Sequence, residues 1–227
     1  MNRVFDMKKF SPEADIERVT KLYEFETQAQ NEGHKLIAGV DEAGRGSLVG
    51  CVVVAAVILP ENIYLERLDD SKKLSAKVRE NLYDKITLSA VAYNAVCVDV
   101  DEIDKLNIYR ATLAGMKRAV EGLSVAPDFV LTDAMKVDFG IPTRAIVHGD
   151  ALSASIAAAS IVAKVTRDRL ADDWAKTFPQ YGFEHNRGYG TAQHLAAIEK
   201  HGFCAIHRRS FNPVKSLVGG TINAKLL

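Results

Sequence analysis

The chain has 227 residues, 48% of them hydrophobic, a size and composition typical of one soluble globular domain. No apolar run approaches the roughly 18 residues needed to span a bilayer, and the first ten residues contain no hydrophobic stretch of signal-peptide type. This pattern excludes a membrane-embedded protein and predicts a cytoplasmic one. Cys51, Cys97 and Cys204 are scattered and odd in number, so we expect reduced packing residues rather than redox or zinc-binding residues.

The net charge is zero, but the charges are unevenly distributed. Residues 161–227 contain ten Lys and Arg against five Asp and Glu, a net charge of +5, so residues 1–160 carry −5. A basic end beside an acidic remainder suits a protein in which carboxylates hold metal ions and a separate face meets phosphates. Ordinary scatter of surface charge gives the same totals, and charge alone does not decide between these readings.

Residues 1–35 are polar and charged and contain one predicted helix. Ser11 suits an N-cap and Pro12 suits the first turn, so the helix is expected to begin there. Apolar residues at helical spacing then predict a modestly amphipathic helix that ends near Gly33. We expect a packing role for this segment.

The segment Leu36–Leu59 carries the most informative pattern in the sequence. Two apolar runs rich in β-branched residues, Leu36–Val40 and Cys51–Leu59, predict neighbouring buried strands joined by a glycine-rich turn. The first run ends in two adjacent carboxylates, Asp41 and Glu42. Two ionised groups at the end of a buried strand are costly unless something pairs with them, and a divalent metal ion would explain their presence.

The middle of the chain predicts strands interspersed with helices. Ser75 can cap a helix, and Pro127 interrupts the chain before a short buried strand. The predicted elements are a helix over Ala76–Ile86, a strand over Val91–Val100, two short helices within Glu102–Val120, and strands over Phe129–Thr132 and Thr143–Val147.

Three of the predicted strands run into acidic residues: Asp41 with Glu42, Asp133, and Asp150. One such ending means little, since Asp is common where strands stop. Three are harder to dismiss, because ligands of α/β sheets bind beyond the strand ends. The sequence therefore favours a shared metal site. Adjacent strand residues point to opposite faces, so Asp41 and Glu42 can share it only if the strand ends or bulges there.

The stretch Ala151–Lys164 predicts a helix of small residues, which permits close approach to a sheet, so we expect it to be central. It begins just after Asp150, where its positive N-terminal end would stabilise negative charge. The helix is expected to continue over Val165–Trp174, with Lys164 and Arg167 on exposed turns.

Past this helix, Tyr189 stands between Gly188 and Gly190, and Thr191 can cap a following helix. A tyrosine between two glycines favours a ligand-stacking role, because glycines provide no packing neighbours, although a core position stays open. Aromatic residues interleaved with Arg and His fit nucleic-acid contact by stacking and phosphate pairing.

Six motifs together resemble those of bacterial type 2 ribonuclease H, the ribonuclease HII family. In chain order they are Asp41–Gly46 (DEAGRG), Asp70–Leu74 (DSKKL), Thr132-Asp133, Gly149-Asp150 with Ser155–Asp168 (SIAAASIVAKVTRD), Gly188–Thr191 (GYGT) and His207–Phe211 (HRRSF). The match runs from about Ile37 to Val214, and its first motif and long Ala/Ser helix are the most specific parts. Arg45 in Gly-Arg-Gly resembles type HII rather than type HIII, which carries Lys there.

The chain departs from the family pattern at four positions. The family usually has Pro where Ser47 and Cys51 stand, commonly Lys where His148 stands, and Gly where Ala134 stands. None of these differences removes a carboxylate. Ser47 lies in the turn that presents the Gly-Arg-Gly backbone, so fine substrate preference is the property most open to change.

The resemblance implies an α/β protein with an RNase H-like fold, a central mixed sheet flanked by helices and a C-terminal helical subdomain. It implies an N-terminal helical extension (1–35), a catalytic core (36–175) and a C-terminal helical, basic substrate-binding segment of the same domain (176–227). The implied activity is endonucleolytic hydrolysis of RNA in RNA–DNA hybrids, and of single ribonucleotides embedded in duplex DNA. Cleavage 5′ of the ribonucleotide would leave 3′-hydroxyl and 5′-phosphate ends, and the enzyme is expected to act as a monomer.

The resemblance also implies which residues carry the chemistry. Two Mg²⁺ or Mn²⁺ ions roughly 4 Å apart would supply a hydroxide-like nucleophile and neutralise charge on the departing oxygen, and such hard ions take oxygen ligands. The implied catalytic and metal-binding residues are Asp41, Glu42, Asp133 and Asp150, the first of them bridging.

Substrate contacts follow from the same resemblance. The implied residues are Gly44, Arg45, Gly46 and Tyr189. The backbone of the first three would read the 2′-hydroxyl that separates RNA from DNA, and the tyrosine would stack on the sugar of the next nucleotide. Candidate phosphate contacts are Lys72, Lys73, Lys164, Arg167, Arg208 and Arg209.

Two other classes of function stay open at this point. A catalytically silent nucleic-acid-binding module could use the same fold, although the intact carboxylates argue against it. A two-metal enzyme that acts on other substrates, such as a DNA nuclease or resolvase, would carry a similar acidic site.

Overall fold

A computed structural model describes residues 11–219, and its centre is a five-stranded mixed sheet. The order of strands across the sheet is β3-β2-β1-β4-β5, with β1, β2 and β3 antiparallel neighbours and β4 and β5 parallel to β1. The strands are β1 (Ile37–Ala43), β2 (Val52–Ile58), β3 (Ala92–Val98), β4 (Phe129–Asp133) and β5 (Thr143–Ile146). The predicted mixed sheet is confirmed, and the expectation for the first ten residues lies outside the described range.

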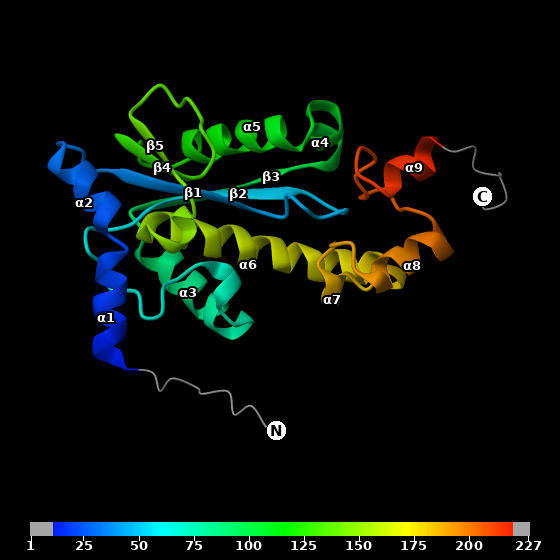
Figure 1. The fold of residues 1–227 in the computed structure, drawn as a ribbon, viewed down its shortest axis with the longest axis horizontal. Helices are drawn as coiled ribbons and strands as arrows, with labels where there is room; N and C mark the ends of the chain where they lie inside the picture. Colours follow the sequence, from blue (N-terminus) through cyan, green and yellow to red (C-terminus); the bar gives the residue numbers. More distant parts are fainter. Residues whose placement is uncertain (1–10, 220–227) are drawn as a thin grey trace.

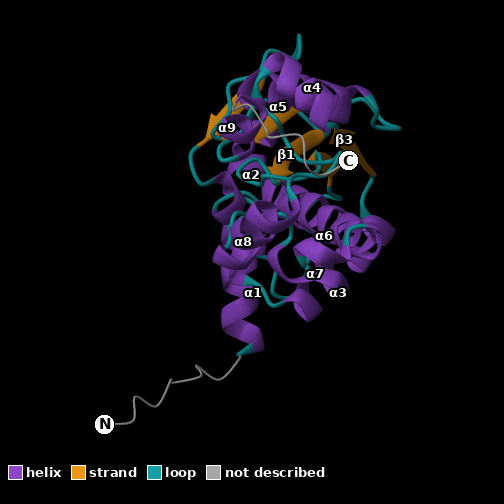
Figure 2. Cartoon of the chain, turned by 90° about the vertical axis from the view of Figure 1, so that its right-hand side faces the viewer, coloured by secondary structure: helices purple, strands orange, loops and turns teal. Residues whose placement is uncertain are grey.

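Helices cover both faces of this sheet, as Figures 1 and 2 show. The α-helices are α1 (Pro12–Lys21), α2 (Glu24–Asn31), α3 (Ala76–Ser89), α4 (Val100–Leu106), α5 (Ile108–Glu121), α6 (Ala154–Thr177), α7 (Phe183–Asn186), α8 (Ala192–His201) and α9 (Val214–Gly219). Short 3-10 helices are η1 (Ser71–Lys73), η2 (Gly149–Ala151) and η3 (Pro179–Tyr181). Within the described part of the chain, no helix is long and apolar enough to cross a membrane.

The two helical layers explain why β2 is apolar along its whole length. Val53 and Val57 belong to the hydrophobic cluster formed with α6 and α3 on one face. Val54 and Ile58 belong to the cluster formed with α5 on the other face. Successive residues of a strand point to opposite faces, so a strand covered on both sides reads as a continuous apolar run.

Helix α6 packs directly on β1 because both present small residues. A Cβ atom on Gly39 would lie 2.0 Å from the carbonyl carbon of Ser155, so only glycine permits this approach. The prediction that this helix is central is confirmed. It begins at Ala154, three residues later than predicted, because His148 is left-handed (φ 59°) and the chain forms η2 before the Ser153 N-cap.

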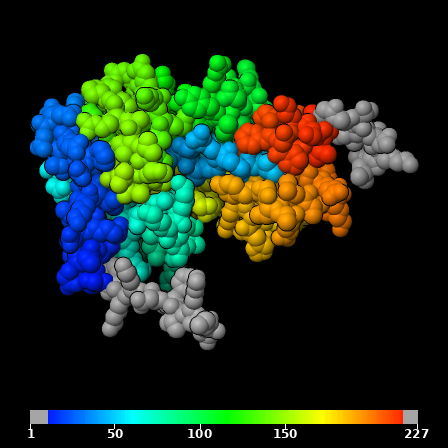
Figure 3. All heavy atoms as spheres, viewed as in Figure 1, coloured from blue at the N-terminus to red at the C-terminus, as the bar shows by residue number. Residues whose placement is uncertain are grey.

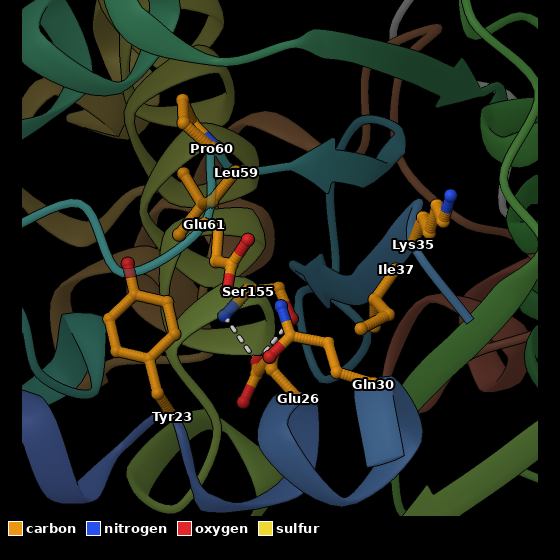
Figure 4. Close-up of a pocket in the computed structure, with 9 residues that line it drawn as sticks. All are labelled: Tyr23, Glu26, Gln30, Lys35, Ile37, Leu59, Pro60, Glu61 and Ser155. Atoms are coloured by element: carbon orange, nitrogen blue, oxygen red, sulfur yellow. Dashed lines mark hydrogen bonds between the residues drawn. The ribbon is translucent and has the colours of Figure 1, made fainter. Parts of the chain in front are cut away.

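The prediction of one N-terminal helix is wrong, since the segment forms α1 and α2 with a break at Leu22 and Tyr23. Tertiary contacts favour the break. The carbonyl of Leu22 accepts a hydrogen bond from the Ala154 amide, and Glu26 Oε1 accepts bonds from the Ser153 hydroxyl (2.6 Å) and the Ser155 amide (2.9 Å). Figure 4 shows Glu26 of α2 pointing toward Ser155. The N-terminal helices therefore dock on the start of α6, which follows Asp150.

The residues after α6 fold back onto the turn between β1 and β2, at one end of the sheet (Figure 1). Val49 forms an isolated β-bridge with His207, and the Leu48 amide donates to the carbonyl of Gly188. In Figure 3 this C-terminal segment, orange to red, lies apart from the cyan segment that leads into α3. The β1–β2 turn is therefore held from the C-terminal side.

Candidate active site

The three acidic strand endings meet where β1 and β4 separate. The parallel ladder between these strands ends at the pair Val40 and Thr132. Asp41 and Asp133 are the next residues on each strand, so they flank the opening of the crevice. Asp150 reaches the same place from η2, whose Gly149 amide donates to Asp133 Oδ1 at 2.8 Å.

These aspartates form the acidic cluster: Asp41, Asp133 and Asp150 each offer one oxygen, and the three oxygens lie within 4.8 Å of one another. Asp41 and Asp150 are buried, each only 4% exposed. Three carboxylates gathered this closely, from positions up to 109 residues apart in sequence, suit a divalent cation that prefers oxygen ligands.

Glu42 lies beside the cluster rather than in it. β1 neither ends nor bulges at this point, since its pairing with β2 continues through Ala43. The expectation that Glu42 shares the site only at a strand end or bulge is wrong, because its side chain lines the same cleft. Its Oε1 accepts a hydrogen bond from Arg45 Nη1 at 3.1 Å. Within residues 11–219 its Oε2 is buried without a hydrogen-bond partner. An unpartnered carboxylate oxygen at the edge of an acidic cluster fits a cation ligand.

The cluster is electrostatically costly without a cation. Burial, followed by the charges of Glu42 and Asp133, raises the pKa of Asp41 well above its ordinary value. Burial also raises the pKa of Glu42 and that of Asp133. Like charges held in a poorly solvated crevice disfavour ionisation, and a bound divalent cation would reverse that preference.

One lysine partly compensates this negative charge. Lys72 Nζ lies 2.8 Å from Asp150 Oδ2, and its side chain is largely exposed on η1. Burial opposes its charge, but the hydrogen bond and charge of Asp150 raise the pKa of Lys72 above its ordinary value. The loop that carries it is held by Arg79, which donates to the carbonyls of Ser71 and Leu74.

The Gly-Arg-Gly turn and Lys72 both line the cleft. Gly44 has φ +94°, and a Cβ there would collide with the Arg167 guanidinium, so this glycine is required by the turn itself. A Cβ on Gly46 would meet only Tyr189, at 3.9 Å. Gly46 is thus the glycine of the pair that leaves open space toward the cleft.

Two arginines predicted as phosphate contacts lie beneath this turn instead, so that prediction is wrong for them. Arg167 and Arg208 are buried, at 1% and 0% exposure. Arg208 donates to the carbonyls of Gly44 and Arg45, both at 2.8 Å, and of Gly50 at 2.9 Å. Arg167 donates to backbone carbonyls of the same turn and of Arg187. Their charges hold backbone in place.

The other predicted basic residues stay near the surface. Lys73 and Arg209 are exposed, and Lys73 Nζ pairs with Asp69 at 3.0 Å. Lys164 is partly buried, lines the cleft and pairs with Asp168 at 2.6 Å. Burial, ahead of that pairing, lowers the pKa of Lys164.

Tyr189 lines the same cleft as Asp41 and Asp133. Its side chain is 40% exposed, and the Arg167 guanidinium lies 5.5 Å from its ring centroid. The Ser47 hydroxyl donates to the carbonyl of Val49, which closes the turn where the family usually has Pro. The Leu48 amide donates to the carbonyl of Gly188, which joins the turn to the loop that carries Tyr189.

Comparisons with known proteins agree with this geometry. A family model described as Ribonuclease HII matches residues 38–214. A ribonuclease HII of Enterococcus faecalis is 48% identical over 214 residues, which is 94% of this chain and 84% of that protein.

Solved structures show the same arrangement of elements. The ribonuclease H2 of Pyrococcus horikoshii has a TM-score of 0.69 and 27% identity, covering 81% of this chain and 97% of that chain. Bst-RNase HIII in complex with Mn²⁺ has a TM-score of 0.60 and 15% identity, covering 81% of this chain and 69% of that chain.

Fold and acidic site together define a type 2 ribonuclease H with an RNase H-like fold. The chain belongs to the ribonuclease HII family, and it is an endonuclease that hydrolyses phosphodiester bonds. The recognition made from the six motifs is therefore confirmed.

Proposed function

We propose that this enzyme cleaves RNA in RNA–DNA hybrids and nicks duplex DNA on the 5′ side of a single embedded ribonucleotide, leaving 3′-hydroxyl and 5′-phosphate ends. The observation that carries the proposal is the acidic cluster, with oxygens within 4.8 Å of one another, in one cleft with Gly46 and Tyr189. The cluster supports phosphodiester hydrolysis, and Gly46 and Tyr189 in the same cleft offer a means to recognise ribose.

Asp41, Asp133 and Asp150 would hold two divalent ions. Glu42 would be a fourth ligand through its unpartnered Oε2. Such ions generate a nucleophile at neutral pH and neutralise charge on the leaving oxygen. The Mn²⁺ in Bst-RNase HIII supports Mn²⁺ or Mg²⁺ as the occupant. In the metal-free protein Lys72 pairs with Asp150, and its exposed side chain is free to contact a substrate phosphate.

Selectivity would come from the wall formed by the turn and Tyr189. Only a 2′-hydroxyl separates a ribonucleotide from its neighbours in DNA, so backbone groups must approach the sugar closely. The open space at Gly46 permits that approach, and the half-exposed ring of Tyr189 can stack on the adjacent sugar. Lys73, Lys164 and Arg209 are the remaining candidates for phosphate contacts. We further propose a cytoplasmic, monomeric enzyme with a C-terminal substrate-binding segment.

The test uses a duplex DNA with one ribonucleotide, incubated with Mg²⁺ or Mn²⁺, beside an RNA–DNA hybrid and an all-DNA duplex of the same sequence. We expect metal-dependent nicking 5′ of the ribonucleotide, cleavage of the hybrid, and no cleavage of the all-DNA duplex. Equal cleavage of the all-DNA duplex would instead indicate a DNA nuclease. Binding to the substrate without cleavage under either metal would indicate a silent binding module.

A further inference from the structure

Two buried histidines connect the C-terminal segment to the loop that carries Tyr189. His194 on α8 and His207 are 0% and 1% exposed. His194 Nε2 lies 3.2 Å from His207 Nε2, and His194 Nδ1 lies 2.9 Å from the carbonyl oxygen of Tyr189. On the far side, His207 Nδ1 lies 3.0 Å from the backbone nitrogen of Cys204 and 3.1 Å from its Sγ. The thiol can donate or accept, so the backbone amide, which can only donate, decides the role of this nitrogen. The four groups form one continuous chain of contacts.

The groups at both ends fix the direction of every hydrogen bond in this chain. A backbone N–H can only donate, so the Cys204 amide makes His207 Nδ1 an acceptor and leaves the His207 proton on Nε2. That Nε2–H then donates to His194 Nε2. The His194 proton must therefore be on Nδ1, where it donates to the Tyr189 carbonyl, which can only accept.

Both rings must be neutral for the chain to exist, and their surroundings support this. Burial lowers the pKa of His194, and burial together with the neighbouring His194 lowers the pKa of His207 to about 4. The rings of Tyr181 and Phe183 pack edge-on or tilted against the pair, which keeps water out. At neutral pH each ring therefore carries a single proton at a defined nitrogen.

Hydrogen bonds, rather than local backbone preference, hold the backbone at Tyr189, whose amide donates to the carbonyl of Asn186. Glycines flank the residue on both sides, and Gly188 has φ +81°, so local backbone preference does little to fix it. Its carbonyl accepts from His194 Nδ1 and from the Thr191 amide, while its ring stays in the cleft. Losing the His194 bond removes the one side-chain anchor seen on this carbonyl within the described residues.

We propose that His207 and His194 are positioning residues, which fix the place of Tyr189 in the cleft through a relay of hydrogen bonds with one allowed tautomer at each ring. The inference rests on the proposed role of Tyr189 in recognising the sugar next to the ribonucleotide. His207 acts through His194, because its Nε2–H donates to His194 Nε2 and so leaves the His194 proton on Nδ1, which contacts the Tyr189 carbonyl. A pure packing role would leave the tautomers free and would be satisfied by an apolar side chain of similar size.

The tautomers can be observed without any assay of activity. Long-range ¹H–¹⁵N NMR spectra of the metal-free protein at pH 7.5 distinguish protonated from unprotonated ring nitrogens. We expect the proton on Nδ1 of His194 and on Nε2 of His207, with signals assigned from the His194→Asn and His207→Asn variants. Protonation of His194 at Nε2, or rapid averaging of either ring, would overturn the relay.

Kinetics test whether the relay serves Tyr189. His194→Leu keeps the volume but removes the donor, so nicking at a single ribonucleotide should fall roughly fivefold, the effect of one lost hydrogen bond. His194→Asn places an amide donor where Nδ1 was and should restore most of the rate. His207→Asn should be harmful in the wild-type background but neutral in the His194→Asn background, because an amide donor needs no tautomer to be chosen for it. His201→Leu, an exposed histidine on the same helix, is the control.

Failure of the relay and failure of the proposed function give different results. In a Tyr189→Ala background, His194→Leu should cause no further loss if it acts through that side chain, and a full additional loss would overturn the relay. If Tyr189→Ala itself nicks single-ribonucleotide substrates normally, the proposed role of Tyr189 is wrong while the tautomers can still be as described. If His194→Asn loses as much nicking activity as His194→Leu, the amide donor gives no rescue. The histidines then serve packing alone, and the relay is overturned.

Discussion

Asp41 is a proposed catalytic-site residue whose ionised carboxylate lowers the stability of the metal-free protein. It is buried among other carboxylates, and burial ahead of those charges raises its pKa. A carboxyl group whose pKa is higher in the folded than in the unfolded protein binds a proton more tightly when folded. The metal-free protein therefore loses stability as pH rises from the ordinary carboxyl range through the raised pKa of Asp41.

We accordingly predict that Asp41→Asn stabilises the metal-free protein at pH 7.5 by about 1–2 kcal/mol while abolishing cleavage. The asparagine Oδ1 can keep the bond that Asp41 accepts from the Glu42 amide. The gain should shrink toward pH 4.5, where the wild-type carboxyl binds its proton. Thermal unfolding in EDTA at both pH values measures this, and a lower melting temperature of the variant at pH 7.5 would contradict it.

Ala134 carries a second cost at the residue scale. It follows Asp133 where the family usually has Gly, and its φ is +53°, in the left-handed region. Ala134→Gly should therefore stabilise the protein by about 1 kcal/mol without loss of activity, since an L side chain is strained there. Ala196→Gly, at an exposed position inside α8, is the matched control and should destabilise by about 1 kcal/mol. Equal signs for the two substitutions would refute the argument.

At the scale of elements, the C-terminal segment fastens the turn between β1 and β2 through Arg208. Removing this guanidinium takes a side-chain donor away from each of the carbonyls of Gly44, Arg45 and Gly50. Arg208→Met should thus weaken both stability and substrate binding by disordering the turn. The exposed Arg209 has no such role, because its side chain lies at the surface and its amide is held by Asp104.

The salt dependence of binding separates these two arginines. Each phosphate contact contributes roughly −0.9 to the slope of log K against log salt concentration. Arg208→Met should lower affinity for the duplex substrate without changing this slope, because the side chain meets backbone rather than phosphate. Arg209→Ala should flatten the slope by nearly one unit if it contacts a phosphate. A flatter slope for the Arg208→Met variant would show that Arg208 contacts a phosphate.

At the scale of the molecule, the sequence predicted most of the architecture because hydrophobic pattern and caps act locally. The caps at Ser75 and Thr191 are confirmed, and each strand lies over its predicted apolar run. The boundaries differ, since β1 continues through Ala43 and the small-residue helix begins three residues late. The site was predictable as far as acids at strand ends, and Asp41, Asp133 and Asp150 do meet.

The predictions that were wrong, or that the sequence could not make, concern side-chain orientation. The orientation of a side chain depends on tertiary contacts that no local pattern encodes. Arg167 and Arg208 looked like surface cations, yet they satisfy backbone carbonyls that come from distant segments. The pairing of His194 with His207 could not be predicted from the sequence either, since the two rings come into contact only when the chain has folded.

The most direct test of the whole account is the effect of Asp133→Asn on nicking and on binding of the same single-ribonucleotide duplex, with exposed Asp138→Asn as control. We predict that nicking falls by roughly a thousandfold or more, since metal assistance is worth several kcal/mol, while binding is retained. Wild-type nicking rates in the Asp133→Asn variant would contradict it, because the three aspartates would then not form the catalytic site.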